Sequence, residues 1–162
     1  MSPRAAARLE SIGFARVYDY VAGKADWGSA GLALEGENGS KTRAGAHART
    51  DVPTCRLGAE LRQVRKLVEN AGWDTCFVVD GAGVVLGRLE RSALRSDADV
   101  RVEAVMTPGP STIRPSARLE ATVERMRRQD LTNLPVTSSE GKLIGLLARD
   151  DAEAALARLL AS

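Results

Sequence analysis

The sequence predicts a mixed α/β (α+β) fold, in which two copies of a small β-α-β-β-α unit follow a short α/β extension at the N-terminus. The clearest evidence is residues 133–151, where two apolar strands flank a turn at Gly141 and a helix start follows. The same pattern occurs earlier: placing Gly141 on Gly83 gives an offset of 141 − 83 = 58 residues, at which strand, turn and helix positions match. Matches at one fixed offset indicate a duplicated unit.

The composition indicates a small globular protein without an obvious nucleic-acid or metal partner. The chain has 162 residues, 44% of them hydrophobic, and 23 basic against 21 acidic side chains give a net charge of +2. Cys55 and Cys76 do not form a C-x-x-C motif, and His47 is the single histidine, so no metal set is predicted. We expect both cysteines to be small buried apolar residues. Without an apolar run near ~20 residues or a signal sequence, the sequence predicts a cytoplasmic protein with no membrane partner.

The first 50 residues are predicted to hold an extension and a linker. Residues 1–36 are expected to form a helix over 3–12, a strand over 14–21 and a short helix near Trp27. Residues 37–50 lack an apolar period and predict a flexible linker. Aromatic residues gather in the extension, where we expect them to be buried, and four of the six in the chain are Phe14, Tyr18, Tyr20 and Trp27.

The two copies are assigned to residues 51–101 and 102–162. In the first copy we expect strands at 54–57, 76–79 and 84–90 and helices at 59–70 and from 91. In the second copy we expect strands at 111–114, 133–138 and 143–147 and helices at 119–128 and 150–161. Each copy by itself is too small to bury a large core, so we expect the two to pack sheet against sheet.

The second copy resembles the CBS-domain family, and the two copies together resemble a tandem CBS pair, or Bateman module. The resemblance rests on segments 105–110, 135–136 and 145–151, which lie in the order of the family's motifs. It implies two repeats around a pseudo-twofold axis, with two clefts between them in which many members bind adenine nucleotides or S-adenosylmethionine.

Residues 1–36 also resemble the closing segment of a rhodanese domain. The catalytic loop of that family, which carries a nucleophilic cysteine, has no counterpart before this helix. The resemblance therefore argues against sulfur transfer by this chain. Two explanations stay open: the segment is a remnant that docks on the CBS pair, or the true gene start lies upstream.

The family's ribose signature is a Thr or Ser, two further residues and an Asp at the start of the last helix. In the second copy Asp151 keeps the carboxylate, while Ala148 replaces the hydroxyl residue. In the first copy Glu90 and Ala93 occupy the two positions, so neither group is kept. At most one cleft is therefore expected to bind a ribose.

The resemblance further implies which residues would line that cleft. Asp151 would accept hydrogen bonds from the ribose, Arg149 would reach a phosphate, and AMP, ADP, ATP and S-adenosylmethionine are the candidate ligands. The alternative is that Leu134 and Pro135 are core residues and Asp151 is only a helix cap. The wall of the cleft would be formed by Thr112, Ile113, Asn133, Leu134 and Pro135.

Two functions follow from these observations. The first is a non-catalytic regulatory module that senses a ligand, since no catalytic triad, metal set or phosphate loop is visible. The second is a ligand-free dimerisation module, in which helices bearing Leu156 and Leu159 would pair two copies of the chain. A homodimer through the CBS helices is expected in either case, and the sequence identifies no regulated protein partner. A sulfurtransferase is the least favoured reading.

Overall fold

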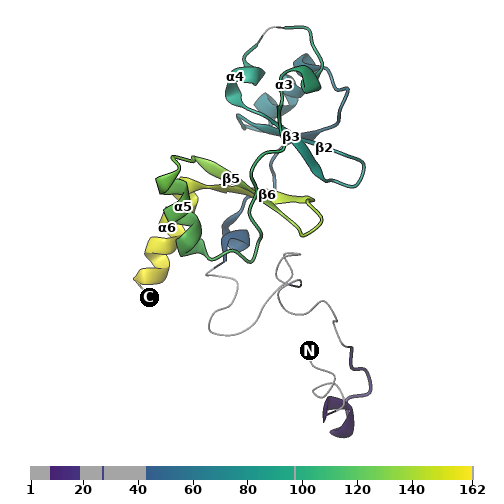
Figure 1. Ribbon diagram of the computed structural model, residues 1–162, viewed down its shortest axis with the longest axis vertical. Coiled ribbons are helices and arrows are strands. Elements are labelled where there is room, and N and C mark those ends of the chain that lie inside the picture. The colour runs from purple at the N-terminus through teal and green to yellow at the C-terminus, as the bar shows by residue number, and fades with distance from the viewer. Residues whose placement is uncertain (1–7, 19–26, 28–42, 97, 162) are drawn as a thin grey trace.

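The structure, a computed structural model, describes residues 8–18, 27, 43–96 and 98–161 (Figure 1). Two similar α/β units lie against each other, with α3 and α4 in the upper unit of Figure 1 and α5 and α6 in the lower one. This arrangement confirms the predicted mixed α/β fold of two repeated units.

The first unit is a four-stranded sheet with two helices. Its elements in chain order are β1 (Thr54–Cys55), α3 (Leu61–Asn70), β2 (Cys76–Val79), β3 (Val85–Leu89) and α4 (Arg91–Leu94). β1 runs parallel to β2, and β2 runs antiparallel to β3. The last strand of this sheet, β4 (Thr107–Pro108), follows α4 in the chain and pairs with β3. Leu61, Val64 and Val68 lie on one face of α3 and are buried in this unit's core, as their helical spacing predicts.

The second unit repeats this arrangement. Its elements are α5 (Leu119–Arg128), β5 (Asn133–Thr137), β6 (Leu143–Ala148) and α6 (Arg149–Leu160). The strand predicted at 111–114 is reduced to a single parallel bridge between Ile113 and Val136, beside β5. On the other side of the hairpin, Arg49 forms an antiparallel bridge with Leu146 of β6. The order Ile113, β5, β6, Arg49 therefore matches the order of the four strands in the first unit.

The segment that leads into each unit packs on the other unit. The short 3-10 helix η2 (Ala44–His47) contacts β6 and α6, and Ala44 is fully buried in the core of the second unit. The equivalent η3 (Val102–Ala104) supplies Val102 to the core of the first unit. The prediction of a flexible linker is therefore wrong for residues 43–50. That prediction rested on the absence of periodic apolar residues. The segment is nevertheless held in place, because it buries a single small apolar side chain, that of Ala44, in the core of the second unit.

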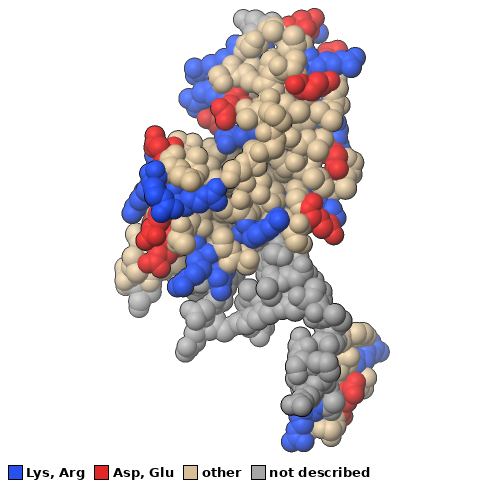
Figure 2. Space-filling view, in the orientation of Figure 1, with Lys and Arg blue, Asp and Glu red and all other residues tan. Residues whose placement is uncertain are grey.

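A pseudo-twofold axis relates the two units. Val84 forms an antiparallel bridge with Lys142. Lys142 is the residue that corresponds to Val84 at the 58-residue offset, so this bridge lies on the axis that relates the two units. Backbone hydrogen bonds of 3.1 and 3.0 Å between segments 83–85 and 141–143 flank this bridge. The two sheets share a small core beneath it, formed by Val52, Phe77, Val79 and Leu146. On the face shown in Figure 2, basic and acidic side chains are interspersed over both units.

The predicted N-terminal extension lies mostly outside the described residues. Residues 8–11 are helical, as expected for the end of the predicted helix, but residues 14–18 form no strand. Phe14 and Tyr18 are 58% and 80% exposed, so the expected burial of the aromatic residues is wrong for these two. The resemblance of this segment to a rhodanese domain finds no support in the described residues.

The first prediction concerns the close approach to β6 of residues 43–50, the segment that leads into the first unit and packs on the second, called the exchanged segment below. A Cβ atom at Gly145 would lie 2.5 Å from the carbonyl oxygen of Arg49. We therefore expect Gly145→Ala to lower the free energy of unfolding by about 1–3 kcal/mol, as overpacking against backbone does, measured by urea denaturation. Gly81→Ala is the matched control, because a Cβ there meets nothing within 4 Å. Equal stability of the two variants would contradict this packing.

Candidate ligand-binding site

A cleft of about 530 Å³ lies between the two units. The first unit contributes residues from the segment before β2 and from the end of β3 and the start of α4, and the second contributes the loop before β5 and the first residue of β5. Its lining residues are Asp74, Arg88, Glu90, Arg91, Asp130, Leu131, Thr132 and Asn133. The cleft is therefore polar, with charged groups of both signs.

Two ion pairs lie at this cleft. Arg91 Nη2 lies 2.9 Å from Asp74 Oδ2, and Arg149 Nη1 lies 3.1 Å from Asp130 Oδ1. The Asp130 side chain is 95% exposed, and solvent-exposed pairs of this kind contribute little to stability. Both guanidinium groups can therefore exchange a carboxylate for a phosphate at small cost.

Arg88 is a third cation of the cleft, and it is more deeply placed. Its Nε donates a hydrogen bond to Thr75 Oγ1 at 3.0 Å, and its guanidinium lies 5.8 Å from the centroid of the Phe77 ring. Burial lowers the pKa of Arg88, while the charges of Glu90 and Asp74 act in the opposite direction. A partly desolvated guanidinium whose hydrogen bond goes to a neutral hydroxyl is well suited to an anionic ligand.

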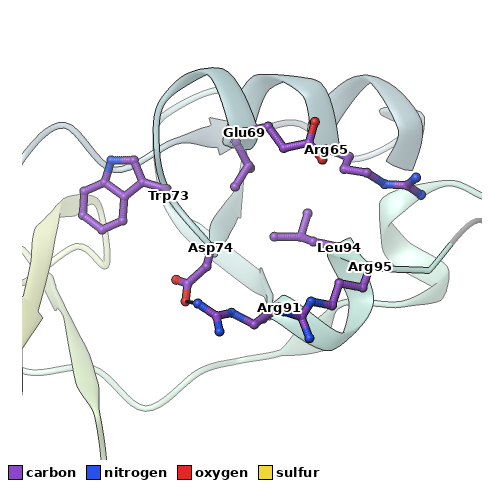
Figure 3. Close-up of a pocket in the computed structure, with 8 residues that line it drawn as sticks. Arg65, Glu69, Trp73, Asp74, Arg91, Leu94 and Arg95 are labelled. Atoms are coloured by element: carbon purple, nitrogen blue, oxygen red, sulfur yellow. Dashed lines mark ion pairs between the residues drawn. The ribbon is translucent and has the colours of Figure 1, made fainter.

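A smaller hollow of about 250 Å³ lies within the first unit, between α3 and α4 (Figure 3). Asp74 and Arg91 line both hollows, whereas Val68 and Leu94 form an apolar part of this one. In Figure 3 the Trp73 ring points away from these side chains, toward the strands of the second unit. The indole is therefore presented to the junction between the units.

At that junction Trp73 is stacked with Arg49 from the exchanged segment. The guanidinium carbon lies 4.1 Å from the indole ring centroid, within the range of a cation–π contact. Arg49 also binds Asp51 through two nitrogens, with Nη2–Oδ2 at 2.7 Å and Nε–Oδ1 at 3.2 Å. The hydrogen bond to Asp51 raises the pKa of Arg49, and the negative charge of Asp151 raises it further. Arg49 therefore lies between the indole and the carboxylates of both units.

The hydrogen bond from Arg49 lowers the pKa of Asp51, and the nearby indole N–H of Trp73 contributes in the same direction. The Trp73 Nε1 atom is itself buried and has no hydrogen bond of good geometry among the described residues. The indole N–H therefore faces the Asp51 carboxylate without a hydrogen bond of good geometry to it.

The structure places most of the predicted cleft wall in the core of the second unit. Ile113 and Leu134 are 8% and 2% exposed, and Pro135 is buried as well. The backbone N–H of Ile113 donates to Pro135 O at 2.9 Å, and its carbonyl accepts from Thr137 N, so neither group is free to bind a base. Thr112 accepts a hydrogen bond from the Thr137 hydroxyl at 3.1 Å. The sequence left open the alternative that Leu134 and Pro135 are core residues, and in the structure both are buried.

Within the second sheet, β5 lies between Ile113 and the strand that leads to Asp151. Ile113 lies beside β5, at one edge of the second sheet, whereas α6 and Asp151 follow directly after β6. The neighbour of β6 on its other side is the exchanged segment with Arg49. Arg49 of the first unit is near enough to Asp151 for that carboxylate to raise its pKa, and Asp51 and Trp73 are contacts of Arg49. Sequence reasoning missed them, although extending the 58-residue offset upstream of Asp51 would have included this segment in the repeat.

Asn133 and Arg149 lie where a ligand in the cleft can reach them. Asn133 lines the cleft, and its Oδ1 atom is buried without a hydrogen-bond partner among the described residues. The backbone N–H of Arg149 donates to Thr132 O at 2.8 Å. Because α6 begins at Arg149 and not after Asp151, Asp151 is exposed in the first turn of the helix and is not its cap. A carboxylate there is favoured by the helix dipole and stays accessible.

Within the part of the chain that the structure describes, no three His, Cys, Asp or Glu side chains are grouped to hold a metal ion. A search of the same residues finds no helix that is both long and apolar enough to cross a membrane.

Comparisons with known proteins agree with the repeated fold. Residues 102–158 match the CBS-domain family. The structure resembles the crystal structure of the cytosolic domain of the Mg2+ channel MgtE in complex with ATP, with a TM-score of 0.65, 27% identity and coverage of 70% of this chain and 48% of that one. It also resembles CBSX2 of Arabidopsis thaliana, solved in complex with AMP, with a TM-score of 0.64, 21% identity and coverage of 72% and 97%. The two-unit fold thus resembles solved CBS-domain pairs.

Two curated relatives show the same region inside longer proteins. This chain is 30% identical over 102 residues to the magnesium transporter MgtE of Thermus thermophilus, covering 59% of this chain and 23% of the transporter. It is 31% identical over 105 residues to inosine-5'-monophosphate dehydrogenase of Mycobacterium tuberculosis, covering 63% of this chain and 20% of that enzyme. The chain thus spans less than a quarter of these two relatives.

The second prediction concerns the ion pair beside the indole. Arg49 lowers the pKa of Asp51, so the ion pair between them stabilises the folded chain when Asp51 is ionised. This stabilisation is fully present above the ordinary carboxyl pKa and is lost as the pH falls through the lowered pKa of Asp51. We expect an NMR titration to show Asp51 below its usual range and Arg49→Gln to raise its pKa. Glu103 is the control, since the backbone N–H of Gly58, 2.9 Å away, lowers its pKa instead. An unchanged Asp51 in the variant would rule out the pair.

Proposed function

We propose that this CBS pair is a non-catalytic regulatory module that binds an adenine nucleotide or S-adenosylmethionine in one cleft between its repeats, on the side of Asp151. The observation that carries the proposal is that an aromatic ring, a carboxylate and a set of cations from both repeats meet at this junction. These three groups suit the three parts of a nucleotide: its base, its ribose and its phosphates.

The adenosine part is expected between Trp73 and Asp151. The indole offers a flat apolar face on which a base can stack, worth about 1–3 kcal/mol for a base on an aromatic side chain. Arg49 holds that face in the absence of ligand, 4.1 Å from its centroid, so the base is expected to displace the guanidinium or to stack beside it. The exposed carboxylate of Asp151 can accept hydrogen bonds from both ribose hydroxyls.

The anionic part is expected in the cleft lined by Arg88 and Arg91. Arg88 is partly desolvated, and Arg91 and Arg149 are held by weak surface pairs that a phosphate can replace. S-adenosylmethionine would place its carboxylate, in place of a phosphate, near the same cations. Asn133 adds an amide at this cleft.

The ligands of structural neighbours support this class of compound. One neighbour was crystallised with ATP, a second with AMP, and a third, a CBS pair 15% identical to this chain with a TM-score of 0.61, with 5-methylthioadenosine and S-adenosyl-L-methionine. Since the curated relatives carry this region inside longer proteins, the regulated partner is expected to be either a covalently attached domain or a separate protein.

Assembly without a ligand is the second candidate function. Leu67 on α3 and Leu160 on α6 are 47% and 79% exposed, and helices of both repeats could pair in a homodimer. The two leucines predicted to mediate pairing, Leu156 and Leu159, are partly buried against their own core. A dimer contact of α6 would therefore use Leu160 as well.

The third prediction tests ligand binding through Trp73. In a Trp27→Phe background, in which Trp73 is the remaining tryptophan, we expect ATP, ADP, AMP or S-adenosylmethionine to change the fluorescence saturably and to raise the melting temperature. A ligand at a hundredfold excess over Kd stabilises by about 2.7 kcal/mol. Asp151→Ala should weaken binding roughly 10- to 100-fold, since hydrogen bonds to a charged group are lost.

Asp150→Ala is the matched control, because Asp150 is the neighbouring exposed carboxylate in the same helical turn. Equal weakening by the two variants would indicate a general charge effect instead of ribose recognition. No response to any of the four compounds at millimolar concentration, with a dimer seen by sedimentation, would overturn the sensor proposal in favour of assembly.

A further inference from the structure

The two cysteines of the chain lie on neighbouring strands of the first repeat. Cys55 is in β1 and Cys76 is in β2, and the parallel register places Cys55 opposite Val78. Opposed residues point to one face of a sheet, and so do residues two apart on a strand. Cys55 and Cys76 are therefore diagonal neighbours on the same face, and both pack in the core of the first repeat.

The two thiols differ in access to solvent. Cys76 is fully buried, and its Sγ lies 3.8 Å from the backbone oxygen of Phe77. Cys55 is half-buried, on a two-residue strand at the edge of the sheet. A reagent can therefore reach Cys55 first.

The thiols also interact with each other. A hydrogen bond from Cys76 lowers the pKa of Cys55, whereas the same contact and burial raise the pKa of Cys76. The more exposed Cys55 sulfur is thus the better nucleophile, and the buried Cys76 stays a protonated thiol. This is the division of roles that a pair of attacking and resolving cysteines requires.

We propose that Cys55 and Cys76 form a reversible intramolecular disulfide when the chain meets a small disulfide such as oxidised glutathione. The Cys55 thiolate attacks the glutathione disulfide, forms a mixed disulfide and releases one glutathione thiolate, which takes up a proton. The Cys76 thiol then loses its proton, attacks the Cys55 sulfur and releases the second glutathione. In sum, two protein thiols are oxidised, and one glutathione disulfide is reduced to two glutathione thiols.

The bond would connect two segments that also form the ligand site. Cys55 follows the exchanged segment with Arg49 and Asp51, and Cys76 lies three residues after Trp73. A disulfide would fix β1 to β2 and thereby hold the Arg49 segment near the indole. This inference extends beyond ligand sensing and does not depend on it, because the bond forms within the first repeat.

The experiment equilibrates the full chain with reduced and oxidised glutathione at several ratios and traps free thiols with a maleimide under denaturing conditions. We expect intact mass to show loss of two hydrogens and no maleimide at oxidising ratios, a monomer on a non-reducing gel, and a Cys55–Cys76 cross-linked peptide. The oxidised chain should also melt at a higher temperature than the reduced chain, because the bond restricts the unfolded state.

Cys55→Ala and Cys76→Ala are the matched variants, and each should lose the oxidation-dependent rise in melting temperature. Cys76→Ala should retain a mixed disulfide with glutathione at Cys55, whereas Cys55→Ala should leave the buried Cys76 unmodified in the folded chain. Two maleimide adducts at the most oxidising ratio, a stable mixed disulfide on the wild-type chain, or disulfide-linked dimers in place of the internal bond would each overturn the proposal.

Discussion

The exchange of leading segments between the two repeats is the contact on which the rest of the structure depends. The first sheet is completed by β4 of the second repeat, and Arg49 of the first repeat forms a bridge beside β6 of the second. Gly145 permits this approach, because any Cβ there would meet the Arg49 carbonyl. Ala44, from the segment before the first repeat, is buried in the core of the second repeat, and Val102 is buried in the core of the first. Neither core is complete alone, so we expect the two repeats to fold as one unit.

The exchange also makes the candidate site a composite of both repeats. It brings Arg49 and Asp51 of the first repeat to the helix start that carries Asp151 in the second. Arg49 is stacked on the indole while it binds Asp51, and its hydrogen bond lowers the pKa of Asp51. A ligand that takes the face of Trp73 would change these contacts in both repeats, which is how binding at one place can be transmitted through the pair.

The pseudo-twofold symmetry does not extend to the chemistry of the two sides. At the 58-residue offset, Trp73 corresponds to Leu131 and Arg49 to Thr107. The aromatic stacking face and its cation therefore exist on one side of the axis, and it is the side where Asp151 keeps its carboxylate. Duplication supplied two equivalent positions, and substitution has left the groups of the candidate site together at one of them.

The sequence by itself determined the repeated unit, because turn glycines and apolar strand positions recur at a fixed offset and local patterns set local structure. Helix Leu119–Arg128 and strand Cys76–Val79 have the predicted bounds for this reason. The tertiary structure alone decided where residues 43–50 lie and which groups surround Asp151. A segment that buries one alanine has no periodic apolar pattern to recognise. Its position is set by contact with β6, about a hundred residues later in the chain. For the same reason Ile113 and Leu134, assigned to a cleft wall, lie in the core, while Arg49 stacks on Trp73 and lies near enough to Asp151 to feel its charge.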